Sequence, residues 1–116
     1  MRYEVYQAAK AAIERVINIA DRPIGDQELL SLRLKMDEAR FFFPLREVAI
    51  FNRIDDLITQ HEVARAEWER FNDDDATRIR TGDTMGDAIT KLSEIRRSLL
   101  DLLAPELGFA QLTRTP

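Results

Sequence analysis

Apolar residues recur at alternating spacings of four and three between residues 50 and 71, and this pattern constrains the fold more than any other feature of the sequence. Such spacing places the side chains on one face of an α-helix, because the helix turns once every 3.6 residues. A helix over residues 45–72 would be about 40 Å long at 1.5 Å per residue. Its predicted seam consists of Ile50, Ile54, Leu57, His61, Ala64, Trp68 and Phe71.

Two earlier segments show the same helical period. The first covers residues 3–20, contains several alanines that would let a neighbouring helix approach closely, and ends at Pro23 and Gly25. Asp26 is a typical N-cap residue for a second helix, over residues 27–42. Pro44 removes a backbone donor and clashes with the preceding turn, so it ends the second helix and leads into the third.

A fourth helix is predicted over residues 85–103. Thr84 and Asp87 resemble a capping box at its start. Residues 73–83 are interpreted as a polar connection that could contain a short helical turn, with a break at Gly82. The tail beyond it is expected to fray after Phe109 and Leu112. The sequence contains no strand-period alternation and no internal repeat. We therefore predict one all-α domain over residues 1–116, an antiparallel four-helix bundle in which the third helix is the longest.

Composition excludes several classes of function. The 116 residues carry a formal charge of −4 with a pI near 5.0, which argues against nucleic acid as a partner, because binding through phosphates needs a basic face. Cysteine is absent, and no apolar run approaches the ~20 residues that a membrane span requires. We expect a cytoplasmic protein, or the cytoplasmic portion of a longer membrane-anchored one.

The predicted second helix has two apolar stripes. The first contains Leu29, Leu32, Met36, Ala39 and Phe43. The second lies roughly opposite and contains Leu30, Leu34 and Phe41. One stripe is enough for a helix at the corner of a small bundle, so the second implies that this helix packs centrally, that the tail covers it, or that it meets another chain. The favoured interpretation is a homodimer.

His61, Arg65 and Trp68 form a second candidate patch, at i, i+4 and i+7 of the third helix. A partly buried, hydrogen-bonded histidine is the structural interpretation of His61, and a register-setting or pH-sensitive contact is the functional one. Arg65 could stack on the indole of Trp68. Together with Phe41 and Phe42, these residues define the alternative of an aromatic pocket for a small ligand or for an unrecognised enzyme.

A charged residue falls inside the apolar arc of the fourth helix. Arg96 must either extend to water or meet an acid, for which Glu47 and Asp37 are the options, and extension to water at the helix edge is the favoured interpretation.

Catalytic and metal-binding motifs are not found. The run from Asp73 fails as a calcium loop, because Arg78 stands where the loop needs glycine and Thr84 where it needs glutamate. No phosphate-binding glycine loop, nucleophile elbow or zinc-protease motif is present. The sequence therefore predicts no catalytic, cofactor-binding or metal-ligating residue.

The stretch from residue 37 to residue 58, "DEARFFFPLREVAIFNRIDDLI", resembles a segment of small helical domains of uncharacterised bacterial proteins, which are often membrane-anchored. In those domains an Ala-x-Phe-Leu-Phe segment ends one helix and an aliphatic-rich helix follows. The resemblance implies no activity and no catalytic residue, and it favours a cytoplasmic appendage of an envelope protein. The matching positions are Ala39, Phe41, Phe42 and Phe43 for the segment, and Val48, Phe51 and Ile54 for the helix.

From these observations we predict a non-catalytic interaction or assembly module that self-associates through surplus apolar helix faces.

Overall fold

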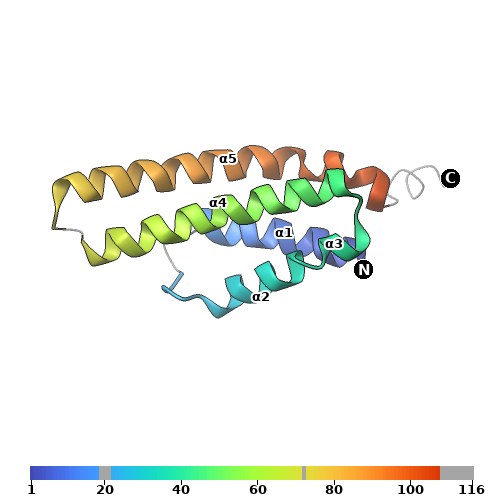
Figure 1. The fold of residues 1–116 in the computed structure, drawn as a ribbon, viewed down its shortest axis with the longest axis horizontal. Coiled ribbons are helices and arrows are strands. Elements are labelled where there is room, and N and C mark those ends of the chain that lie inside the picture. The colour runs from blue at the N-terminus through green and yellow to red at the C-terminus, as the bar shows by residue number, and fades with distance from the viewer. Residues whose placement is uncertain (19–21, 72, 108–116) are drawn as a thin grey trace.

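The computed structural model describes residues 1–18, 22–71 and 73–107, and within these ranges it contains helices and no strand. The predicted all-helical class is confirmed. Figure 1 shows α4 and α5 side by side along the whole molecule, with α1 against part of their length and α2 beyond α1. The longest dimension is 59 Å. The elements are α1 (Arg2–Ile17), α2 (Gln27–Met36), the one-turn α3 (Ala39–Phe42), α4 (Leu45–Arg70) and α5 (Asp75–Leu107).

Helix α1 is amphipathic, as its sequence period predicts. Its alanines at positions 8, 9 and 12 are buried, and these small side chains allow neighbouring helices to approach closely. Asn18 follows the last helical residue, and its backbone N–H donates to the carbonyl of Glu14. The predicted continuation through Ile19 and Ala20 lies outside the described residues.

Helix α2 begins at Asp26, whose carboxylate accepts a hydrogen bond from the backbone N–H of Glu28 at 3.1 Å. It ends at Met36 rather than at residue 42, because the backbone tightens there: the N–H of Glu38 donates to the carbonyl of Lys35, three residues back. The predicted helix over residues 27–42 is therefore two helices, α2 and α3. The extended conformation of Phe43 before Pro44 then ends α3.

Helix α4 is buried along two stripes rather than one. The predicted seam is buried from Ile54 to Ala64 and opens toward solvent at Phe71. A second stripe, also at spacings of four and three, has charged residues at both ends and shares Ile54 and His61 with the first. It consists of Glu47, Phe51, Ile54, Ile58, His61 and Arg65, all of them buried.

The prediction that the helix over residues 45–72 is the longest is wrong, because α5 has 33 residues and α4 has 26. The predicted break at Gly82 is also wrong, since α5 starts at Asp75, ten residues before the expected start. Asp74 stabilises this start: its side chain accepts a hydrogen bond from the Thr77 hydroxyl, and its carbonyl accepts from the N–H of Arg78. The expected fraying of the tail at Phe109 and Leu112 lies outside the described residues.

The α4–α5 hairpin extends beyond the end of α1 (Figure 1). Near the middle of the molecule, Leu57, Ile58 and Leu92 are fully buried in one core with α1. Toward the hairpin turn, Val63 and Ile79 are more than half exposed. In the part of the chain that the structure describes, no helix is both long and apolar enough to cross a membrane.

Substituting the two glycines inside α5 tests where this helix begins. A Cβ added at Gly82 or Gly86 meets no atom within 4 Å, so alanine fits without strain. We expect Gly82→Ala and Gly86→Ala each to raise the free energy of unfolding by about 0.5–1 kcal/mol in urea titrations, because alanine loses less backbone entropy in a helix. Gly25→Ala is the control and should destabilise, since Gly25 has φ +73°. Unchanged stability in Gly82→Ala would contradict a helix that begins at Asp75, whereas Gly86 lies inside both the predicted and the observed helix.

Candidate functional site

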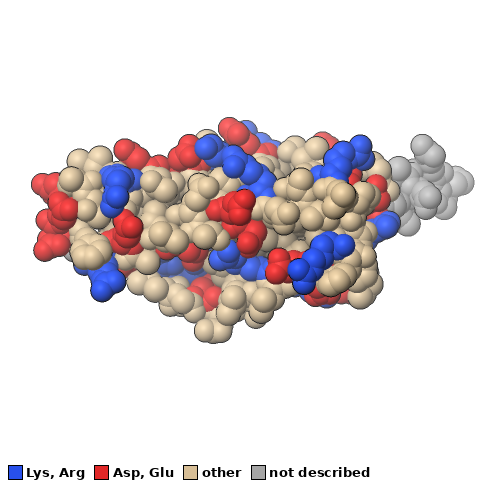
Figure 2. All heavy atoms as spheres, viewed as in Figure 1, with Lys and Arg blue, Asp and Glu red and all other residues tan. Residues whose placement is uncertain are grey.

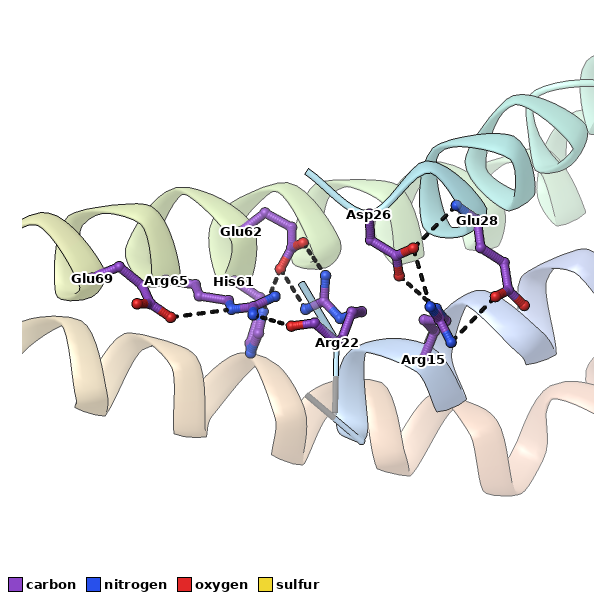
Figure 3. A network of polar contacts seen from close by, with 8 residues as sticks. All are labelled: Arg15, Arg22, Asp26, Glu28, His61, Glu62, Arg65 and Glu69. Atoms are coloured by element: carbon purple, nitrogen blue, oxygen red, sulfur yellow. Dashed lines mark hydrogen bonds and ion pairs between the residues drawn. The ribbon is translucent and has the colours of Figure 1, made fainter. Parts of the chain in front are cut away.

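An ion pair between a buried arginine and a half-buried glutamate joins the segment between α1 and α2 to the middle of α4. Arg22 precedes α2 and has a side chain that is only 1% exposed. Its guanidinium donates to both carboxylate oxygens of Glu62, with 2.8 Å between Nη2 and Oε2 (Figure 3). Such two-bond geometry is the strongest form of an arginine–carboxylate contact.

Glu62 is ionised over most of the pH range. Burial alone would raise the pKa of its carboxyl, but the hydrogen bonds from Arg22 and His61 outweigh burial and lower the pKa from 4.5 to about 2. The carboxylate can therefore only accept hydrogen bonds at neutral pH.

His61 lies beside this pair and is fully buried. Its Nδ1 is 2.9 Å from Oε2 of Glu62, and because the carboxylate is an acceptor, Nδ1 must carry the hydrogen. Nε2 is buried and has no hydrogen-bond partner among the described residues. His61 thus helps to orient Glu62 from inside the core.

Arg65 is buried one turn after His61, with 8% of its surface exposed. Its Nη2 donates to the backbone carbonyl of Arg22, and its Nε lies 4.0 Å from the carboxylate of Glu69. Nη1 is buried without a hydrogen-bond partner in the described chain. The predicted partner of this guanidinium was the indole of Trp68, but the arginine is held instead by the backbone at Arg22.

A second polar group lies at the start of α2 (Figure 3). Arg15 of α1 donates to both carboxylate oxygens of Asp26, at 2.5 and 3.1 Å, and is also 3.3 Å from Glu28. The hydrogen bonds from Arg15 lower the pKa of Asp26, against the opposing effect of burial. The same carboxylate therefore caps α2 and ties it to α1.

A pocket of about 310 Å³ lies between the start of α2 and the middle of α4. Its polar lining includes Arg65, Glu62, Arg33 and Asp26. Its apolar lining consists of Ile24, Leu29, Leu30 and Ala66.

The second apolar stripe of the predicted second helix is exposed. Leu30, Leu34 and Phe41 are 49%, 61% and 70% exposed. Figure 2 shows that most atoms along the lower edge, where α2 lies, are uncharged. The first stripe, in contrast, is turned into the core: Leu29, Met36, Ala39 and Phe43 are buried and Leu32 is half-buried.

The residues of the predicted aromatic pocket are not brought together around the observed pocket. Phe41 is exposed, Phe42 is half-buried with its carbonyl accepting from Arg2, and Trp68 is half-buried. None of these three lines the 310 Å³ pocket, and neither does His61. Of the predicted patch on α4, only Arg65 reaches it.

Arg96 extends to water, as favoured from the sequence, and does not form the alternative buried pair with Glu47. Arg96 is exposed, because its position at the edge of the apolar arc of α5 lets the long side chain reach water. Glu47 is buried, and its Oε1 accepts from the neighbouring Arg46 at 3.0 Å. Its Oε2 has no partner among the described residues.

Sequence reasoning did not identify Arg22 or Glu62. The two residues are 40 positions apart, and neither belongs to an apolar pattern or a motif. One signal was available in the sequence. Glu47, Ile58 and Arg65 fall at helical spacing on the second stripe of α4. Residue 62 is four residues after Ile58 and three before Arg65, so a charged side chain there lies close to a buried face.

Comparison with protein-family models, with curated proteins and with solved structures gives no match to this chain. Over the described residues, no group of three or more His, Cys, Asp or Glu side chains is placed to hold a metal ion.

The Glu62 contact predicts a specific loss of stability in acid. The pKa of Glu62 is lower in the folded chain than in the unfolded chain. The contribution of Glu62 to the free energy of unfolding is therefore complete above pH 4.5 and is lost as the pH falls toward 2. Between these limits we expect the free energy of unfolding of the wild type to fall by about 3 kcal/mol more than that of Glu62→Gln. Chemical denaturation at a series of pH values measures this difference.

Glu67→Gln is the matched control, because Glu67 lies on the same helix with a 41% exposed side chain. It should keep the wild-type pH profile. If the free energy of unfolding of the wild type and of Glu62→Gln changed with pH in parallel, the ion pair between Arg22 and Glu62 would not form.

Proposed function

We propose that this chain is a non-catalytic assembly module that forms a two-fold homodimer through the outer face of α2 and α3. The observation that carries the proposal is the exposure of Leu30 and Leu34 on α2 and of Phe41 on α3, while most of the opposite stripe is buried in the core. A contiguous apolar surface of this kind on a folded protein is typical of an interaction site. Ile24, which is 59% exposed, lines a pocket together with Leu30, and Leu45 at the start of α4 is 87% exposed.

A second copy of the chain fits this face because the face is self-complementary. In a two-fold interface the same surface meets itself in the opposite direction. An axis near Lys35 would place Leu30 of one chain against Phe41 of the partner subunit, since the two positions lie on either side of that axis. The branched Leu34 side chain would then lie near the centre of the contact.

Sedimentation velocity from low to high micromolar protein concentration tests the proposal. We expect the wild type to shift from monomer to dimer and Leu34→Asp to stay monomeric, because an aspartate at the centre of the contact would be desolvated without a partner. Leu100→Asp is the control: Leu100 is similarly exposed, at 42%, but lies on α5, so this variant should dimerise like the wild type.

A wild-type chain that is monomeric throughout the series would overturn the proposal. If Leu100→Asp lost association to the same extent as Leu34→Asp, the result would indicate that the interface does not lie on α2.

A further inference from the structure

A smaller pocket, of about 230 Å³, lies where the end of α2 and the one-turn α3 meet the first half of α4. None of its lining residues belongs to the apolar stripe of Leu30, Leu34 and Phe41 that the proposed dimer would cover. The pocket is therefore a separate feature of the molecule. Its lining consists of Met36, Asp37, Ala39, Arg40, Val48, Phe51 and Asn52.

The break between α2 and α3 shapes this pocket. Sharp breaks in helices usually occur at proline or glycine, yet residues 33–43 contain neither. The chain nevertheless leaves the helix after Met36 and resumes it at Ala39, with both side chains buried. Tertiary packing thus overrides the local helical preference at this point, which is common at functional sites.

Two exposed side chains of opposite charge line the pocket without pairing. Asp37 and Arg40 are three residues apart, a spacing at which charged side chains on a helix are neighbours. Among the described residues, the Asp37 carboxylate has no hydrogen-bond or ion-pair partner. The Arg40 guanidinium lies 5.0 Å from the centroid of the Phe41 ring, and this contact leaves its N–H donors open.

Neighbouring charges on the same segment do form ion pairs. Arg33 donates to Asp55 of α4 at 2.8 Å, and Lys35 lies 3.2 Å from Glu38. One acceptor group and one donor group therefore remain available, and both border the same pocket.

A ligand that carries both charges matches this arrangement. An ammonium group would donate to Asp37, and a carboxylate would accept two parallel hydrogen bonds from Arg40. The amide of Asn52, which is exposed, offers a further donor and acceptor.

The apolar part of the lining favours a short hydrocarbon side chain. Met36, Ala39 and Phe51 are buried and Val48 is half-buried. The volume lies below the range of sites for drug-sized molecules, so the ligand is small. We infer that this pocket binds a free α-amino acid with a short apolar side chain, its carboxylate on Arg40 and its ammonium group on Asp37. The inference goes beyond the proposed function and does not depend on self-association.

Titration of the full chain with L-valine, followed by the backbone amide resonances in NMR spectra, is the direct test. Isovalerate has the same tail and carboxylate without the ammonium group, isobutylamine lacks the carboxylate, and glycine lacks the tail. We expect valine to cause saturable shifts at the lining residues. Each of the other three should bind at least about tenfold more weakly, because it lacks one charge-assisted hydrogen bond or the apolar contact.

Two variants locate the binding, each with a matched control. Asp37→Asn and Arg40→Gln each remove one charge from the pocket. Asp56→Asn and Arg53→Gln make the same changes at exposed positions of α4 outside it. We expect each pocket variant to weaken valine binding at least about tenfold and each control to leave it unchanged.

The titrations are repeated on Leu34→Asp, which separates ligand binding from dimer formation because Leu34 does not line this pocket. Circular dichroism of every variant checks that it is folded, and the four polar substitutions at exposed positions are expected to leave the fold intact. Three results would overturn the inference. They are the absence of saturable shifts with valine, binding of isovalerate or isobutylamine as tight as that of valine, and equal valine affinity in the pocket variants and their controls.

Discussion

The position of α2 depends on the ion pair between Arg22 and Glu62. Arg22 lies in the segment that connects α1 to α2, and a guanidinium with 1% exposure is tolerated only when its charge is matched. Glu62 supplies that match from the middle of α4, and Arg65 holds the carbonyl of the same arginine. The three contacts place the chain so that Asp26 can meet Arg15 and begin α2 against α1.

This placement determines which surface the molecule presents. Once Asp26 is anchored, Leu29 and Met36 face the core and Leu30 and Leu34 face solvent, because positions one residue apart on a helix differ by about 100°. The same anchoring opens the pocket between α2 and α4 beside Arg65. The proposed dimer face is thus a consequence of this polar cluster.

Several elements could be predicted from the sequence because their causes are local. Three such elements are the amphipathic pattern of α1, the N-cap at Asp26 and the start of α4 after Pro44. Each depends on residues within a turn or two of one another. The predicted start of α5 is wrong because Gly82 indicates a break, although a single glycine costs a helix only about 1 kcal/mol. Packing of α5 along α4 is not visible in the local sequence, whereas the contacts of Asp74 at the start of α5 are local.

The sequence by itself determined that the chain is helical and that its second helical segment carries more apolar surface than one bundle corner needs. Periodicity is encoded in consecutive residues, so one chain is enough to read it. Only the tertiary structure decided which stripe is covered, that Arg96 reaches water, and that Arg22 meets Glu62 across 40 residues. These outcomes depend on how distant segments share one core, and the physical reason is that a buried charge selects its partner by position in space rather than along the chain.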